Sequence, residues 1–221
     1  SFTLAVNDLI VRGITDSVTF LVKPGQYVEQ VSIPEIMGTT DTSGIRFTSF
    51  TGDSSSVILK YTVIDNNLNY VLRLNGADHI VLDRITMQAD DAGLKASVLG
   101  GRVLEYFNSA SHNTVTGCAL IGLPINTTST TYAVIYSSGG NDDYNRFIGN
   151  LVKNGSYGAY LWGYGFSYPE QGLEMQRNRF ENFYGRGLYM GGMLNAMLHH
   201  NILIASNIAA SMYLIYMSEM A

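Results

Sequence analysis

A short segment in which apolar and polar residues alternate recurs along the chain between residues 79 and 204. The copies are HIVLDRITM (79–87), NTVTGCALI (113–121), NRFIGNLVK (145–153), LEMQRNRFEN (173–182) and AMLHHNILI (196–204). The interval between copies shortens toward the C-terminus, so a strand is kept while a connecting loop varies in length. Repeats of this kind bury their apolar faces only by stacking on one another, which predicts a solenoid.

Superposing the copies aligns a polar column with an apolar column. The polar column holds Asp83, Cys118, Asn150, Asn178 and Asn201, and the apolar column holds Ile85, Leu120, Val152, Phe180 and Leu203. We expect the apolar column to line the inside of the coil. Stacked asparagines satisfy their own and their neighbours' polar groups at a bend, so we interpret Asn150, Asn178 and Asn201 as a structural ladder.

The composition narrows the class of protein. Charged residues make up 14% of the 221 residues, below the usual quarter, which disfavours a helical bundle. The net charge is −5 without a long basic run, so nucleic acid is not an expected partner. No apolar run approaches the roughly 20 residues that cross a bilayer. The single cysteine, Cys118, is interpreted as a small buried residue.

The two ends of the chain differ in pattern from its middle. Ser1 can cap a helix whose apolar residues recur at helical spacing up to Gly13, and we expect this helix over 1–13 to cover the first turn of the solenoid. We expect irregular first rungs over about 18–70 and regular rungs over 71–221, within one domain. The last apolar strand has no polar cap, so we expect further chain or a partner molecule beyond Ala221.

Four stretches carry a resemblance to a known family. They are AVNDLIVRG, VTFLVKPGQYVEQVSIP, IRFTSFTGDSSSVIL and LRLNGADHIVLDRITM. Together they resemble the right-handed parallel β-helix domain of the pectate-lyase-like superfamily, in the versions found in large secreted or cell-surface proteins of Bacteroidota. The PGQYVEQ element resembles the family's PGxYxE turn. The resemblance implies an all-β solenoid, and its scaffold hosts lyases, hydrolases, adhesins and structural shafts.

The enzymatic signatures of that superfamily are not matched. Asp90-Asp91 and Asp142-Asp143 are carboxylate pairs in turn-like sequence, and we interpret both as solvated turns. The nearest approach to a lyase set is Asp83 with Arg84, and Glu174 with Arg177 and Arg179. Adjacent histidines at His199-His200 cannot both face one ion from a regular strand. We therefore assign no catalytic residue, metal site or cofactor.

An aromatic stretch, YGAYLWGYGFSY (157–168), is the candidate for recognition. If it stays extended, Tyr160, Trp162, Tyr164, Phe166 and Tyr168 share one face. Aligning the strands that precede each repeat stacks Tyr160, Tyr189 and Tyr213 outside, with Tyr136 and Trp162 beside them. Such rings either shield the backbone between rungs or form a contact surface. The predicted contact residues are Tyr136, Tyr160, Trp162, Tyr164, Tyr168, Tyr189 and Tyr213.

Two classes of function are compatible with these observations. The favoured one is a non-catalytic adhesive or architectural module of a large secreted or cell-surface bacterial protein, exported by type IX secretion. Its aromatic face would contact other segments or copies of a surface assembly, or glycan, without membrane insertion. The alternative is a polysaccharide lyase or glycoside hydrolase acting on acidic polysaccharide, with active groups on the loops 88–102 and 124–132. Carbohydrate binding without turnover would depend on Trp162.

Overall fold

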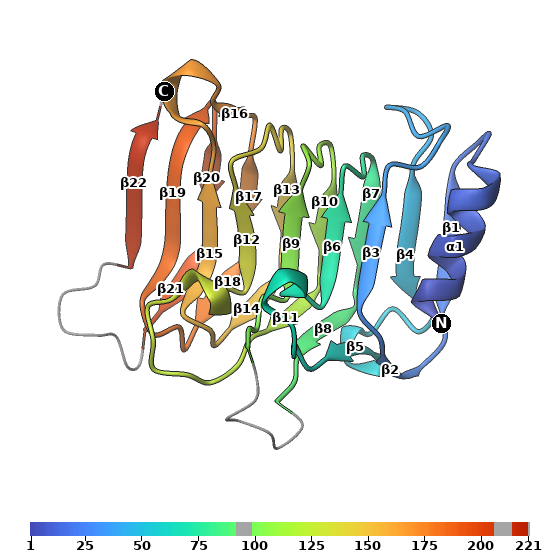
Figure 1. The fold of residues 1–221 in the computed structure, drawn as a ribbon, viewed down its shortest axis with the longest axis horizontal. Coiled ribbons are helices and arrows are strands. Elements are labelled where there is room, and N and C mark those ends of the chain that lie inside the picture. Colours follow the sequence, from blue (N-terminus) through green and yellow to red (C-terminus); the bar gives the residue numbers. More distant parts are fainter. Residues whose placement is uncertain (92–98, 206–213, 221) are drawn as a thin grey trace.

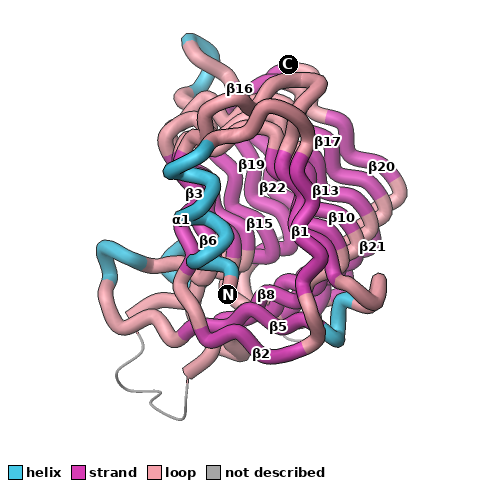
Figure 2. The backbone as a smooth tube through the Cα atoms, turned by 90° about the vertical axis from the view of Figure 1, so that its right-hand side faces the viewer, coloured by secondary structure: helices cyan, strands magenta, loops and turns pink. Residues whose placement is uncertain are grey.

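The chain forms a coil of three parallel sheets in a computed structural model that describes residues 1–91, 99–205 and 214–220 (Figure 1). Successive turns of the coil place their strands in the same three sheets, so strands far apart in sequence pair in parallel. Viewed along the coil, the sheets enclose one apolar interior (Figure 2). This arrangement confirms the all-β parallel solenoid predicted from the repeat.

The strands are distributed evenly among the sheets. Sheet A contains β1 (Val18–Val22), β4 (Ile45–Ser49), β7 (Ile80–Asp83), β10 (Thr114–Thr116), β13 (Arg146–Ile148), β17 (Glu174–Gln176) and β20 (Met197–His199). Sheet B contains β2 (Gly25–Val28), β5 (Val57–Tyr61), β8 (Thr86–Ala89), β11 (Ala119–Ile121), β14 (Leu151–Lys153), β18 (Arg179–Glu181) and β21 (Ile202–Ile204). Sheet C contains β3 (Val31–Pro34), β6 (Leu72–Asn75), β9 (Leu104–Phe107), β12 (Ile135–Ser138), β15 (Tyr157–Trp162), β19 (Arg186–Leu194), β16 (Glu170–Gln171) and β22 (Ile215–Met220).

Each repeated segment is two short strands rather than one. A residue with positive φ separates the sheet A strand from the sheet B strand; these residues are Arg84, Gly117, Gly149, Arg177 and His200. The left-handed conformation turns the chain sharply, so the segment bends around a corner of the coil. The predicted columns are correct from Cys118 onward but not in the first copy. Asp83 pairs with Thr116, and Met87 is the neighbour of Leu120.

The asparagine ladder is confirmed. The Asn150 amide donates to Asn178 Oδ1 at 3.0 Å, and the Asn178 amide donates to Asn201 Oδ1 at 3.0 Å. Asn150 and Asn178 are 2% and 1% exposed, so the ladder supplies partners to backbone groups that water does not reach. A second ladder, which the sequence analysis missed, joins Asn113 and Asn145 at the corner between sheets C and A.

Helix α1 (Phe2–Arg12) begins at Ser1, whose hydroxyl accepts from the Leu4 backbone, and ends at Gly13, as the sequence predicts. Its apolar face buries Phe2, Val6 and Leu9 over the open end of the coil (Figure 1). The Phe2 ring lies 5.9 Å from the Phe47 ring of β4. Short 3₁₀ helices at η1 (Ser54–Ser56), η2 (Asn66–Leu68), η3 (Thr130–Tyr132) and η4 (Gly165–Ser167) interrupt the loops. Among the described residues, no helix is long and apolar enough to cross a membrane.

Candidate functional site

The outward face of sheet C carries a stack of tyrosines. The rings of Tyr136, Tyr160, Tyr189 and Tyr216 follow one another across β12, β15, β19 and β22, with centroids 5.5, 4.8 and 4.7 Å apart. The Arg102 guanidinium lies 3.3 Å from the centroid of the Tyr136 ring at one end of the stack. The sequence analysis stacked Tyr213 on Tyr189, and this pairing was wrong, because the strand partner of Tyr189 is Tyr216. Tyr213 itself lies outside the described residues.

The predicted extended aromatic stretch breaks after Trp162. Strand β15 ends at Trp162, and η4 turns the chain at Gly165–Ser167, so Tyr164 and Tyr168 do not continue the strand face. Trp162 packs on Tyr189 at 5.4 Å between ring centroids. Tyr164 and Tyr168 instead project to solvent, at 63% and 67% exposed, above the corner between sheets C and A.

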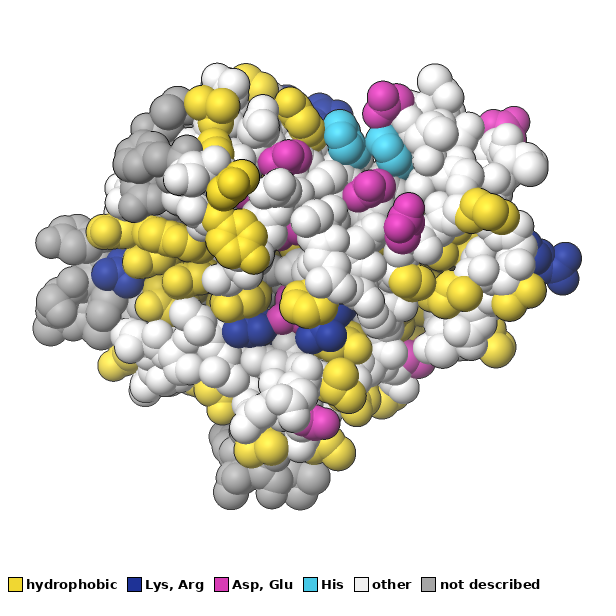
Figure 3. Space-filling view, turned by 45° about the horizontal axis from the view of Figure 1, so that its top comes forward, with side chains coloured by type: hydrophobic (Ala, Val, Ile, Leu, Met, Phe, Trp, Pro, Cys, Tyr) yellow, Lys and Arg dark blue, Asp and Glu magenta, His cyan; other side chains and the backbone are white. Residues whose placement is uncertain are grey.

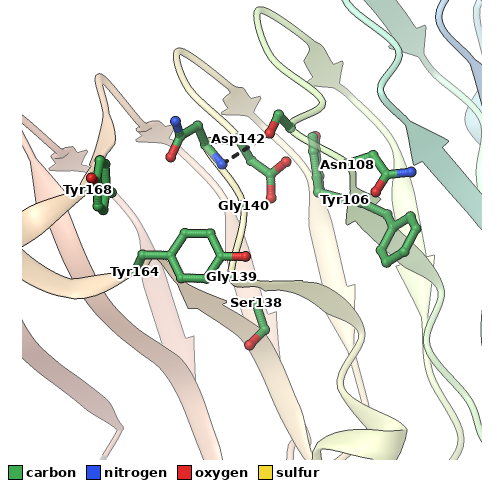
Figure 4. A pocket seen from close by; sticks show the side chains of 11 residues that line it. Tyr106, Asn108, Ser138, Gly139, Gly140, Asp142, Tyr164 and Tyr168 are labelled. Atoms are coloured by element: carbon green, nitrogen blue, oxygen red, sulfur yellow. Dashed lines mark hydrogen bonds between the residues drawn. The ribbon is translucent and has the colours of Figure 1, made fainter.

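That corner contains a groove of about 700 Å³ formed by successive turns of the coil (Figure 4). The loops after β9 and β12 and the segment around η4 provide its walls. The lining residues are Tyr106, Phe107, Asn108, Ser109, Ser138, Gly139, Gly140, Asn141, Asp142, Tyr164 and Tyr168. Gly139 has a φ of 77°, and a side chain there would reach the Tyr164 ring at 3.3 Å. Glycine therefore lets the ring lie against the floor of the groove.

Asp142 is the buried acid of the groove. Its carboxylate is 4% exposed, accepts a hydrogen bond from the Ala110 backbone at 2.8 Å, and accepts another from Ser137 Oγ at 2.5 Å. Burial raises the pKa of Asp142 to about 6, although the hydrogen bonds from Ser137 and Ala110 oppose the change. The interpretation of Asp142 as a solvated turn residue was wrong, because the loop folds its carboxylate back over the preceding rung.

A second buried acid, Glu170 in β16, lies behind Asp142. Ser137 Oγ is 3.1 Å from Glu170 Oε1, and Glu170 is 3% exposed. Burial, followed by the charge of Asp142, raises the pKa of Glu170 well above its ordinary value. One hydroxyl hydrogen cannot serve both carboxyls. The two acids therefore compete for the single Ser137 hydrogen, and burial disfavours ionisation of both at once.

Tyr106 completes the floor of the groove. Its hydroxyl is buried and has no hydrogen-bond partner within the described structure. Burial, together with the charge of Asp142, raises the pKa of this phenol, so the group is a neutral hydrogen-bond donor. Tyr106 and Tyr164 lie on either side of the Asp142 carboxyl (Figure 4). The Tyr106 ring borders the groove, while its hydroxyl is enclosed by protein and faces the interior of the coil.

The other candidates from the sequence are structural. Asp83 is buried in ion pairs with Arg46 and Arg84, at 2.6 and 2.8 Å. Glu174 pairs with Arg146 at 2.7 Å, and Arg179 pairs with Glu181 at 2.9 Å. Burial raises the pKa of Cys118 to about 12, as expected for an unreactive thiol. The lyase set is therefore not assembled at these residues.

Sequence reasoning missed Tyr106, Ser137, Asp142 and Glu170 as one cluster. They come from three turns of the coil, because only Ser137 and Asp142 share a turn, and no spacing along the chain links Glu170 to Asp142. A weak signal was present, because Asp142 follows Gly139-Gly140-Asn141, a turn that bends sharply enough to fold a side chain inward.

No protein-family model matches the chain, and no curated protein matches its sequence. Solved structures do match the chain in fold. A rice weevil pectin methyl esterase aligns at a TM-score of 0.57 and 11% identity, over 89% of this chain and 60% of that protein. A pectin methylesterase of Aspergillus niger aligns at a TM-score of 0.47 and 12% identity, over 98% of this chain and 80% of that one. The chain thus spans 60% of the length of the weevil protein. The likeness to the weevil protein shows that the chain has the right-handed parallel β-helix fold.

Proposed function

We propose that the chain is a carbohydrate-recognising β-helix domain that binds a glycan segment in the groove beside Asp142. The observation that carries this proposal is the pair of exposed rings, Tyr164 and Tyr168, over a groove that asparagine and serine residues also line. Sugar rings offer apolar faces to aromatic side chains and hydroxyls to polar ones. A groove with both features fits that chemistry.

The polarity of the groove favours a neutral glycan. Its lining consists of tyrosines, a phenylalanine, asparagines, serines, glycines and Asp142. These residues give hydrogen-bond donors and acceptors without a cation, while Asp142 adds negative charge at pH values above its pKa of about 6. A uronate would meet repulsion from this carboxylate. Uncharged sugars are therefore the expected ligands, and acidic polysaccharide, the substrate class expected from the sequence, serves as the contrasting probe.

The test is a titration of the purified chain with neutral and uronate-containing oligosaccharides, followed by calorimetry. Tyr164→Ala and Tyr168→Ala should each weaken binding of the best neutral ligand about tenfold, because each removes an exposed stacking surface. Phe50→Ala is the matched control, since Phe50 is 64% exposed and lies outside the groove. Equal affinity in the wild type and both tyrosine variants would contradict the proposal.

A second candidate function is turnover of the bound glycan, which the Glu170–Ser137–Asp142 chain favours. An acid with a pKa near 6 can exchange a proton at neutral pH, and the buried Glu170 proton can follow through Ser137. Protonated Asp142 would give its proton to the leaving oxygen of a glycosidic or ester bond, water would attack the carbon, and the proton that the water loses would return to the Asp142 carboxylate. The atoms balance as a hydrolysis.

The two candidates separate in one experiment. A panel of neutral and esterified polysaccharides is incubated with the chain, and released sugars, alcohols and acids are measured by mass spectrometry. Under the second candidate, Asp142→Asn abolishes release and keeps affinity, while Glu170→Gln changes the pH profile of the rate. Binding without release would leave recognition as the function.

An adhesive role in a secreted or cell-surface protein of Bacteroidota, with type IX secretion, would place this groove outside the cell, where glycans are abundant. The tyrosine stack would then serve as the contact face for other segments or copies. Atomic force measurement of adhesion to glycan-coated surfaces, before and after Tyr164→Ala, tests that role.

A further inference from the structure

A second group of polar side chains lies along the same corner of the coil, beside the groove. His79 precedes β7 and His112 precedes β10, and both adopt a φ of 58°. Their rings stack with centroids 5.0 Å apart and planes inclined by 18°. The His112 backbone donates to Asp143 O at 2.8 Å, and His79 O accepts from the Ile45 backbone at 3.0 Å. These backbone hydrogen bonds therefore fix the main-chain positions of both histidines.

Asp41 approaches this pair from the loop between β3 and β4. Thr40 and Ser43 form a β-bridge across the tip of the loop, and the Thr40 hydroxyl also accepts from the Ser43 backbone at 3.1 Å. This turn holds Asp41 Oδ1 3.8 Å from His79 Nε2. Ligand atoms of Asp41, His79 and His112 all lie within 4.8 Å of one another.

We propose that Asp41, His79 and His112 form a binding site for Zn²⁺ or a similar late first-row divalent cation. Two imidazole nitrogens and one carboxylate are typical ligands of such ions, whereas Ca²⁺ and Mg²⁺ prefer oxygen throughout. With bonds of about 2.0–2.1 Å, ligand atoms around a tetrahedral ion are about 3.3 Å apart. The three side chains must therefore close inward by roughly 1 Å, and the two imidazoles must tilt out of their stack, because the lone pairs of parallel rings do not converge on one ion.

The surroundings of the site suit a cation with an open position. The three residues border a hollow of about 370 Å³ that reaches solvent, which leaves room for water as a fourth ligand. His79 and His112 are neighbours, and the space-filling view shows a pair of adjacent histidines with acidic side chains around it (Figure 3). Arg46 also borders the hollow, but its guanidinium lies 2.6 Å from the Asp83 carboxylate, which offsets its positive charge.

The experiment is calorimetric titration of the chain with ZnCl₂, repeated with CoCl₂ to record the visible absorption of a tetrahedral cobalt site. His79→Asn, His112→Asn and Asp41→Asn are the test variants, because asparagine tolerates positive φ at the histidine positions. We expect one saturable ion per chain, and binding weakened by about tenfold or more in each variant.

The chain supplies its own control. Its remaining histidines, His199 and His200, have rings 6.0 Å apart and tilted by 48°. The double variant His199→Asn/His200→Asn should bind Zn²⁺ as the wild type does. Circular dichroism verifies that every variant is folded. Binding that persists in His79→Asn/His112→Asn, disappears in the control, or does not saturate in the wild type would overturn the proposal.

Discussion

Asp142→Asn isolates the effect of one buried carboxyl on stability, because asparagine has nearly the same shape and stays neutral. The pKa of Asp142 is about 6 in the folded chain, against an ordinary value of 3.8. The folded state thus holds this proton more tightly than the unfolded state does. Stability from the protonated carboxyl is fully present below pH 3.8 and is lost as the pH rises through 6.

The difference between these pKa values corresponds to about 3 kcal/mol. Unfolding free energies from urea titrations between about pH 4 and about pH 7, followed by the fluorescence of Trp162, measure this loss. The wild type should lose about 3 kcal/mol of unfolding free energy relative to the Asp142→Asn variant as the pH rises across that range, because the variant side chain does not ionise. Glu170 is coupled to Asp142 through its charge and through Ser137, so part of the measured change belongs to the pair of acids.

Ser137→Ala provides a control that keeps both acids. The Ser137 hydroxyl lowers the pKa of Asp142, so its removal should move the pH-dependent loss of stability to higher pH. Parallel stability profiles for the wild type and Asp142→Asn would refute the reasoning, since they would mean that Asp142 ionises alike in the folded and unfolded chains.

Other predictions concern the asparagine ladder, the Cys118 thiol and the packing of Gly191 against Trp162. Asn178→Ala should lower the unfolding free energy by about 3 kcal/mol or more, because it leaves the Asn150 N–H and the Phe147 carbonyl buried without partners; the exposed Asn66→Ala should change it little, and equal losses would contradict the ladder. Cys118 should not react with a thiol reagent until the chain unfolds, given its pKa of about 12 and complete burial; rapid labelling of the native chain would refute this. Gly191→Ala should destabilise sheet C in thermal melts, because the new methyl group would lie within 2.4 Å of the Trp162 ring; an unchanged melting temperature would show that the ring can move aside.

The repeat determined the solenoid, because residues that alternate in polarity at a recurring interval can bury themselves only against copies of the same pattern. The Asn150–Asn178–Asn201 ladder was predictable for the same reason, since a column of amides has an obvious partner in each neighbouring rung. The capping helix also followed from local signals, Ser1 at its start and Gly13 at its end. In each case the information lies in residues adjacent in sequence or in equivalent positions of the repeat.

The tertiary structure alone decided the candidate site. Asp142 looked like a surface turn residue, and only the course of its loop over Ala110 buries its carboxyl. Tyr164 and Tyr168 left the predicted strand face because η4 turns the chain after Trp162. Glu170 and Ser137 meet through the pairing of separate rungs. Loops between rungs vary in length and composition, so no repeat encodes their conformation, and the chemistry of this chain resides where the repeat pattern ends.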